Sequence, residues 1–211
     1  MTYGIYRSRK ERRGKSYFLL LFLVTVFAAG IAYSLWRGGE ALYDYYSRSS
    51  RYDRIIRNAG LRNHIDPALI KAVIWKESRF DRRALGLKGE IGLMQIMPGS
   101  GYAAEDWARA HRCRVPSKGA LYDPELNIDI GSWYLGRALS RYRKYKDAAA
   151  LALCEYNAGP RRASDWKPGD PSQPVADRIT IPSTKQYVKD ILNRYALYKK
   201  QESQPAGKGA K

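Results

Sequence analysis

The stretch KESRFDRRALGLKGEIGLMQIMP (residues 76–98) places a carboxyl group where the sequence before it calls for hydrocarbon. In a helix, the apolar residues that precede Glu77 at three-, four-, seven- and eight-residue spacing share one stripe with it: Leu69, Ile70, Val73 and Ile74. A carboxyl group held against hydrocarbon favours its protonated form, which raises its pKa. A glutamic acid still protonated near neutral pH can protonate a leaving-group oxygen. The pattern therefore predicts a general acid at Glu77.

A second interpretation of Glu77 stays open at this point. The residue lies near the end of its helix, where glutamates often turn outward to pair with basic side chains, and three follow closely: Arg79, Arg82 and Arg83. The loop behind them favours a ligand site instead, because its glycines let the backbone approach a bound molecule: Gly86, Gly89 and Gly92. Spacing alone does not decide between the two.

The amino terminus predicts a membrane anchor. Residues 1–15 are basic, and Ser16–Trp36 (SYFLLLFLVTVFAAGIAYSLW) carries no charge. A helix of that length spans roughly 30 Å, the thickness of a bilayer's hydrocarbon core. The basic segment should stay in the cytoplasm, so we expect a single-pass protein of the bacterial inner membrane with its remainder on the periplasmic side. The alternative is a secreted protein whose signal peptide is cleaved near Ala28-Ala29-Gly30.

The charge of the chain indicates an acidic partner. A net charge of +18, from 38 Lys and Arg against 20 Asp and Glu, attracts nucleic acid, anionic lipid or an acidic wall polymer. Export disfavours nucleic acid, and no basic recognition motif is present. The two cysteines, Cys113 and Cys154, are compatible with a disulfide or with two free thiols outside the cytoplasm. Their spacing does not fit a metal site.

The rest of the chain predicts one mainly α-helical domain. A stalk is expected over residues 37–50, the helical domain over 51–199 and a disordered tail over 200–211. Asp66-Pro67 and Asp123-Pro124 each have the form of an N-cap followed by proline at the first helical position. A glycine-broken loop with a short helix is expected between Gly86 and Gly101. Ala158-Gly159-Pro160 should end a helix and open a long loop that reaches residue 177.

Three motifs, in order and with compatible spacing, resemble the soluble lytic transglycosylase family. They are E-S-x-F-D beginning at Glu77, GLMQIMP beginning at Gly92, and EYNAGP beginning at Glu155. LYDPELNIDIGSWYL and the closing Ile181-Pro182 with Tyr187-Val188 match further family segments. The similarity extends from about residue 51 to residue 199.

The resemblance implies a lysozyme-like helical domain of the goose-type or SLT kind, with a groove for the glycan strand of peptidoglycan. It implies cleavage of the β-1,4 bond between N-acetylmuramic acid and N-acetylglucosamine without net addition of water. One glutamate acts as acid and then as base, and the muramoyl 6-hydroxyl closes onto C1 to leave a 1,6-anhydro end. Most glycosidases need two carboxylates, whereas here the substrate supplies the nucleophile. No cofactor or metal is implied.

The resemblance also implies roles for individual residues. Glu77 is the acid and base, and Ser78 ties the end of its helix to neighbouring backbone. Gln95 is expected to hydrogen-bond a sugar or line the groove. Tyr156 should lie near the acid, where it orients that group or stabilises developing positive charge.

Three further positions keep two interpretations each. Asn157 either holds a turn or contacts an acetamido group. Tyr187 either reaches the cleft from the last helix or belongs to the core. Met97 either packs inside the domain or touches a sugar face.

This chain departs from the family pattern at several positions. Gly86 stands where the family often has a serine that supports the reacting sugar. Glu155 replaces a small residue and Ser183 replaces a common glutamate. Of the nearby carboxylates, Asp81 is expected to cap the helix end or loop, and Glu90, which replaces a small residue, is a lesser candidate for a second catalytic group.

Two other functions remain as alternatives. A goose-type muramidase would hydrolyse the same bond, and a non-catalytic wall-binding protein would hold glycan in a basic groove. The sequence names no protein partner and does not distinguish cleavage at chain ends from cleavage in chain interiors.

Overall fold

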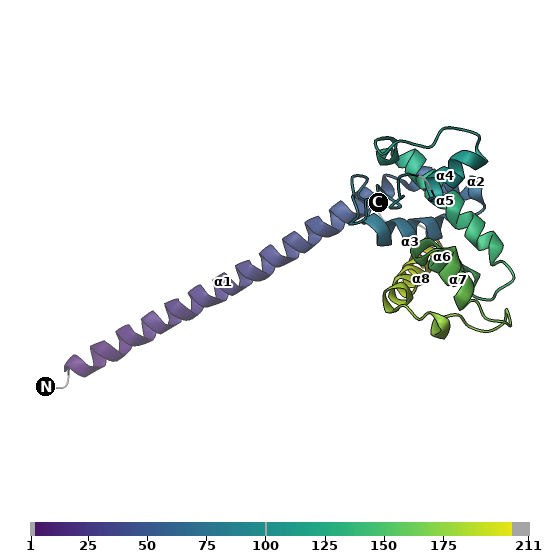
Figure 1. Cartoon of the computed structure of the whole chain (residues 1–211). Coiled ribbons are helices and arrows are strands. Elements are labelled where there is room, and N and C mark those ends of the chain that lie inside the picture. The colour runs from purple at the N-terminus through teal and green to yellow at the C-terminus, as the bar shows by residue number, and fades with distance from the viewer. Residues whose placement is uncertain (1–2, 100, 204–211) are drawn as a thin grey trace. The chain divides into compact units, whose positions relative to one another are not determined.

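The structure is a computed structural model that describes residues 3–99 and 101–203, with side chains described at 17–40, 47–99 and 101–203. The chain divides into two compact units, Met1–Ser47 and Arg48–Lys211. Helix α1, Tyr3–Ser50, runs without interruption through the segments predicted as basic region, membrane span and stalk (Figure 1). The predicted stalk is therefore helical.

Helix α1 contains a candidate membrane span. Tyr17–Glu40 is long and apolar enough to cross a bilayer, and its residues are exposed. Phe18 and Phe27 are 77% and 72% exposed, and the other large apolar residues of this segment that the structure describes as exposed are at least 47% exposed. A soluble helix rarely leaves so many apolar side chains uncovered, since each would gain about 1.5–3 kcal/mol on leaving water.

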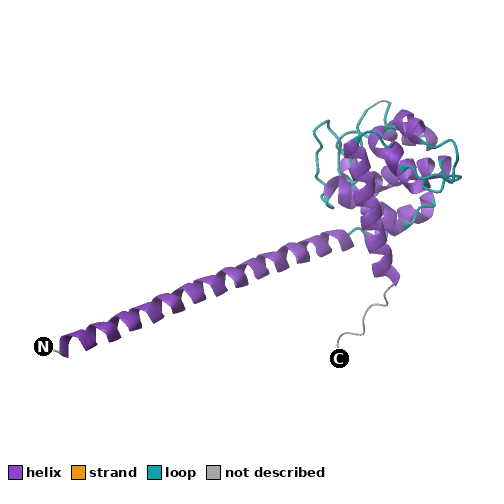
Figure 2. Cartoon of the chain, turned by 90° about the horizontal axis from the view of Figure 1, so that it is seen from below, coloured by secondary structure: helices purple, strands orange, loops and turns teal. Residues whose placement is uncertain are grey.

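The second unit is helical throughout its ordered elements, as predicted. Figure 2 shows only helices and loops in the described residues. The elements are α2 (Asp53–Asn63), α3 (Pro67–Ser78), α4 (Ala103–Ala110), η1 (Ala120–Tyr122), α5 (Pro124–Arg141), α6 (Ala148–Ala158), α7 (Pro160–Trp166), η2 (Ala176–Arg178) and α8 (Pro182–Ser203).

Both Asp-Pro pairs begin helices as the sequence predicts. Asp66 Oδ1 accepts the Ala68 N–H at 2.9 Å, and Asp123 Oδ1 accepts the Leu126 N–H at 2.9 Å. In each case proline takes the first helical position, where its missing N–H leaves no hydrogen bond unmade.

The structure corrects four expectations. Helix α4 was not foreseen, and α7 occupies part of the expected loop, because Pro160 begins a helix rather than only ending one. GLMQIMP does not form a short helix. It forms a tight loop, closed by the pair of hydrogen bonds between Ile91 and Ile96 at 3.0 and 2.9 Å. Residues 200–203 of the expected tail continue α8, and residues 204–211 lie outside the described residues.

The core forms where α3 packs on α8 and where α5 packs on both α2 and α6 (Figure 1). Met94, at the centre of the tight loop, is fully buried against α5. A Cβ on Gly131 would lie 2.6 Å from the Met94 sulfur, so only glycine lets the loop approach this closely. The side chains that fill the surrounding core are fully buried: Ile70, Ile74, Leu93, Ile128, Leu135 and Leu151.

Asn127 of α5 fixes the position of the tight loop. Its side chain is 1% exposed and makes three hydrogen bonds, each 2.8 Å long. Oδ1 accepts the Met94 N–H, and Nδ2 donates to the carbonyls of Ile91 and Leu121. Because a buried amide left without partners costs about 1–3 kcal/mol, this network holds the loop in one register.

Candidate active site

Glu77 lies in the last turn of α3, half-buried, with its carboxyl group turned toward α8. Oε1 accepts a hydrogen bond from the Tyr187 hydroxyl at 2.5 Å. Tyr187 is 6% exposed, so its hydroxyl approaches from the protein interior. Among the described residues no donor reaches Oε2. One oxygen is thus held by the protein and the other is left for a ligand.

The surroundings of Glu77 favour its protonated form. Burial raises the pKa of Glu77 to about 7, and the negative charge of Glu90 adds to this effect. The Tyr187 hydrogen bond and the charge of Lys76 act in the opposite direction. Near neutral pH the group therefore exists in comparable amounts as acid and as carboxylate. A group with such a pKa can both donate and accept a proton in one reaction cycle.

The end of α3 is built to present Glu77. Arg79 and Phe80 take left-handed backbone angles, with φ of 53° and 64°, which turn the chain sharply after the helix. The buried Ser78 Oγ lies 2.9 Å from the Leu93 carbonyl and 3.2 Å from the Ile74 carbonyl. Ser78 thus lies between the helix end and the tight loop.

Tyr156 of α6 lies beside Glu77 without bonding to it. Its hydroxyl donates to the Met94 carbonyl at 2.8 Å, and its ring meets Tyr134 edge-on at 5.9 Å. Burial raises the pKa of Tyr156 well above its ordinary value, and the charge of Glu77 adds to the effect. Tyr156 is therefore a neutral group in the electric field of the carboxyl.

Three other residues singled out from the sequence lie in or just after the tight loop and at the end of α6. Gln95 is in the tight loop with φ of 50°, and its Nε2 donates to the carbonyls of Gly92 and Ala84, at 2.9 and 3.4 Å. Its amide nitrogen is thus engaged by the protein, which leaves only Oε1 for a sugar. Asn157 is exposed and accepts the Thr184 hydroxyl at 2.8 Å, which joins the end of α6 to the start of α8. Met97 is half-buried just after the tight loop.

Two of the departures from the family pattern, Glu155 and Ser183, and the motif residue Asp81 have distinct surroundings. Glu155 is 2% exposed and forms an ion pair with Arg141, and its buried Oε2 has no hydrogen-bond partner among the described residues. Asp81 is exposed and accepts the Arg83 N–H at 2.9 Å, which makes it a loop cap. Ser183 is an exposed residue in the first turn of α8.

Sequence reasoning missed Asn127, the residue that positions the whole tight loop. One signal was present, because Asn127 precedes Gly131 by four residues and so shares its helix face. Both cysteines are free thiols, Cys113 exposed and Cys154 buried, so the disulfide alternative is not realised. The described residues contain no cluster of three or more potential metal ligands.

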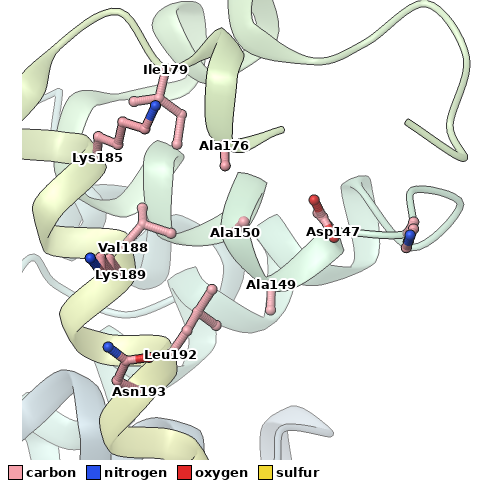
Figure 3. Close-up of a pocket in the computed structure, with 11 residues that line it drawn as sticks. Asp147, Ala149, Ala150, Ala176, Ile179, Lys185, Val188, Lys189, Leu192 and Asn193 are labelled. Atoms are coloured by element: carbon pink, nitrogen blue, oxygen red, sulfur yellow. The ribbon is translucent and has the colours of Figure 1, made fainter. Parts of the chain in front are cut away.

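The structure also contains a pocket of about 410 Å³ between α6 and α8, shown in Figure 3. Its walls are mainly aliphatic, including Ile179, Val188 and Leu192, and its rim carries Lys146, Lys185 and Lys189. Glu77 does not line it.

The desolvated Glu77 carboxyl group, held by Tyr187 at the junction of α3, α8 and the tight loop, is a group that can both donate and accept a proton. The family model of the transglycosylase SLT domain matches residues 54–178. The chain belongs to this family.

Known relatives agree with the family assignment. Soluble lytic murein transglycosylase of Salmonella typhimurium is 30% identical over 177 residues, which cover 81% of this chain and 26% of that protein. Membrane-bound lytic murein transglycosylase C of Edwardsiella ictaluri is 25% identical over 173 residues, which cover 72% of this chain and 48% of that protein. The chain thus spans about a quarter to a half of the length of these relatives.

A solved structure shows the same fold. An inactive mutant of lytic transglycosylase Slt from Pseudomonas aeruginosa, with glutamine in place of a glutamate, superposes with a TM-score of 0.63. The two are 26% identical, and the match covers 72% of this chain and 24% of that one. The expectation of a mainly α-helical SLT-type domain is confirmed.

Proposed function

We propose that this chain is a membrane-anchored lytic transglycosylase that cleaves the glycan strands of peptidoglycan, with Glu77 as its acid and base. The observation that carries the proposal is the state of that carboxyl group, whose pKa burial raises to about 7. Membership of the SLT domain family and the names of the relatives support the substrate class. The inactive Pseudomonas mutant, with its glutamate-to-glutamine change, supports a reaction that depends on one carboxyl group.

The reaction needs one proton and no water. Glu77 gives its proton to the glycosidic oxygen between N-acetylmuramic acid and N-acetylglucosamine, and the bond from that oxygen to C1 breaks. The Glu77 carboxylate then takes the proton of the muramoyl 6-hydroxyl, whose oxygen bonds to C1 and forms the 1,6-anhydro ring. Glu77 ends protonated, ready for the next cycle. A pKa near the working pH suits both steps.

The neighbouring residues support the acid in different ways. Tyr187 holds Oε1 from the interior and fixes the direction of the free Oε2. Tyr156 lies beside the carboxyl group, where its oxygen can stabilise positive charge on the sugar ring. Ser78 and Asn127 keep the helix end and the tight loop together. Gln95 Oε1, Asn157 and Met97 are the proposed contacts to the glycan.

We assign residues 16–36 to a single span of the bacterial inner membrane, with the helical domain of residues 51–199 on the periplasmic side. The uncovered apolar side chains of Tyr17–Glu40 support the span. The basic residues before it, at positions 7–15, support an amino terminus in the cytoplasm. One relative is described as membrane-bound, which supports membrane association of this chain.

Digestion of purified sacculi by the full chain in detergent tests the function. We expect soluble muropeptides with 1,6-anhydro ends, identified by mass spectrometry, and none from the Glu77→Gln variant. A matched variant, Glu202→Gln, removes the same charge at the far end of α8, about 22 Å along the helix from Tyr187, and should keep full activity. Reducing ends would show a muramidase, and bound but uncut glycan would show a wall-binding protein.

A further inference from the structure

The loop before the tight loop brings a second carboxylate to the site. The Gly86 N–H donates to the Glu90 carbonyl at 2.8 Å, and the Gly89 N–H donates to the Gly86 carbonyl at 3.0 Å. Gly89 takes the left-handed angle, φ 92°, that this reversal needs. The turn closes on itself, so Gly86 and the half-buried Glu90 face each other.

Two acceptor oxygens lie where the side chain of a larger residue at position 86 would begin. A Cβ built there would lie 2.7 Å from Gln95 Oε1, and the Glu90 carboxylate oxygen Oε2 lies against the same position. Both atoms therefore occupy the volume next to the Gly86 Cα that a larger residue would fill. Gly86 does not have a positive φ, so conformation does not explain its lack of a side chain.

Both oxygens are held in place before any ligand arrives. Glu90 Oε2 accepts the Lys88 N–H at 2.9 Å, and the Gln95 amide is fixed through its Nε2 on the Gly92 and Ala84 carbonyls. No described donor reaches Gln95 Oε1, and Glu90 forms no ion pair with a described residue. A fixed pair of acceptors, one of them charged, suits a ligand that brings a hydrogen-bond donor.

The acceptor pair is close to Glu77. Gln95 belongs to the tight loop that Ser78 joins to the end of α3, through the 2.9 Å contact with the Leu93 carbonyl. The charge of Glu90 also reaches Glu77, whose pKa it helps to raise. A donor bound over Gly86 would therefore belong to a ligand that also lies against Glu77.

The geometry points to a donor-binding subsite: Glu90 and Gln95 together bind a hydroxyl or amide N–H of the glycan over Gly86, which makes Glu90 a substrate-contacting carboxylate. This inference rests on the proposed function for the identity of the ligand. In a glycan strand, the available donors are sugar hydroxyls and acetamido N–H groups. Hydrogen bonds to a charged acceptor are stronger than those to a neutral one, so the charge on Glu90 is the larger contributor.

Binding of peptide-free glycan strands tests the subsite without any need for cleavage. We would titrate the strands by calorimetry into the full chain carrying Glu77→Gln, which cannot cut them. Adding Glu90→Gln should weaken binding about tenfold, the loss expected for a hydrogen bond to a charged group. Adding Gly86→Ala should weaken it to a similar extent, because the new Cβ displaces the ends of both side chains from these positions without changing charge.

Controls separate the subsite from general effects. Glu202→Gln removes one negative charge from an exposed ion pair with Lys199 and should leave binding within twofold. Strands with de-N-acetylated glucosamine carry a protonated amine in place of the acetamido group and so distinguish the two donors: the loss caused by Glu90→Gln should grow on them if the nitrogen is bound, and should stay the same if a hydroxyl is bound.

The outcomes keep this inference and the proposed function distinct. If the Glu90→Gln and Gly86→Ala changes both leave binding as tight as in the Glu77→Gln parent, the subsite is overturned, even if the chain cleaves sacculi normally. The same holds if the Glu77→Gln parent binds no strands at all. If the chain cuts nothing but both variants weaken binding, the subsite stands and the lytic function falls.

In a chain that cleaves glycan, a second readout is specific to the charge. Without the negative charge of Glu90, the pKa of Glu77 should fall, so the alkaline limb of the kcat/KM profile should move to lower pH in Glu90→Gln. A merely structural role for Glu90 would lower activity at every pH and leave that limb in place.

Discussion

The pocket between α6 and α8 is hollow, whereas the surroundings of Glu77 are filled with hydrogen-bonded groups. The pocket holds about 410 Å³ of space among aliphatic walls, and its carboxylate, Asp147, already accepts the Val175 N–H at 2.9 Å. Glu77 instead has one oxygen held by Tyr187 and one that no described donor reaches, in surroundings that raise its pKa to about 7. A carboxyl group becomes reactive when the fold removes water from it and orients it, and this does not require a neighbouring cavity.

The strongest test of this contrast is Glu77→Gln. The substitution keeps the shape of the side chain and removes the transferable proton, so we expect cleavage of sacculi to fall by about 10³-fold or more. Release of soluble muropeptides measures the rate, and circular dichroism checks that the helical fold is kept. More than a few per cent residual activity would mean that another group supplies the proton.

The second test concerns the framework of the site. Asn127→Ala removes three buried hydrogen bonds, which leaves the Met94 N–H without its acceptor and takes one donor from each of two carbonyls. We therefore expect a loss of about 3 kcal/mol in the free energy of unfolding.

The matched variant for this comparison is Asn193→Ala in the pocket. Its side chain is exposed, so the change should stay within about 0.5 kcal/mol. Urea unfolding of both variants gives the two values, and equal losses would show that the tight loop is not held in the manner described.

Tyr187→Phe should have a smaller and more specific effect. Without its hydroxyl, the Glu77 carboxylate loses the hydrogen bond that stabilises its charged form, so its pKa should rise above about 7. We expect kcat/KM to fall about tenfold near neutral pH and its alkaline limb to move to higher pH. A pH profile of cleavage measures both. If the alkaline limb does not move, Tyr187 does not influence the pKa of Glu77.

The smallest effect is expected in the pocket. Lys189→Glu reverses a charge at its rim, on a helix face that does not carry the Tyr187 hydroxyl, so cleavage of sacculi should stay within about twofold. A loss of tenfold or more, with unchanged stability, would break the contrast and make the pocket part of the glycan site.

The sequence predicted those features that depend on neighbours along the chain. The helical stripe before Glu77 and the two Asp-Pro caps are local patterns, and each appears in the structure as expected. Helix α7 was missed because Gly159-Pro160 is compatible both with the end of one helix and with the start of the next.

Other parts of the site could not be read from local patterns. The Tyr187 hydroxyl and Glu77 are 110 residues apart in the chain, and only the packing of α8 on α3 brings them together. Periodicity gave no sign that Gln95 has a positive φ and uses its amide nitrogen on the loop itself. The acceptor pair over Gly86 depends on that same fold.

Ile91 pairs with both Leu85 and Ile96, so it couples the turn that carries Glu90 to the loop that carries Gln95. A sugar hydrogen-bonded to one of these oxygens would therefore also affect the backbone segment that carries the other. The amide protons of Ile91 and Ile96, each bonded to the other residue's carbonyl, should exchange with deuterated solvent more slowly once glycan is bound. The exchange rates of these two amide protons would report whether glycan occupies the site, even in a variant that does not cleave it.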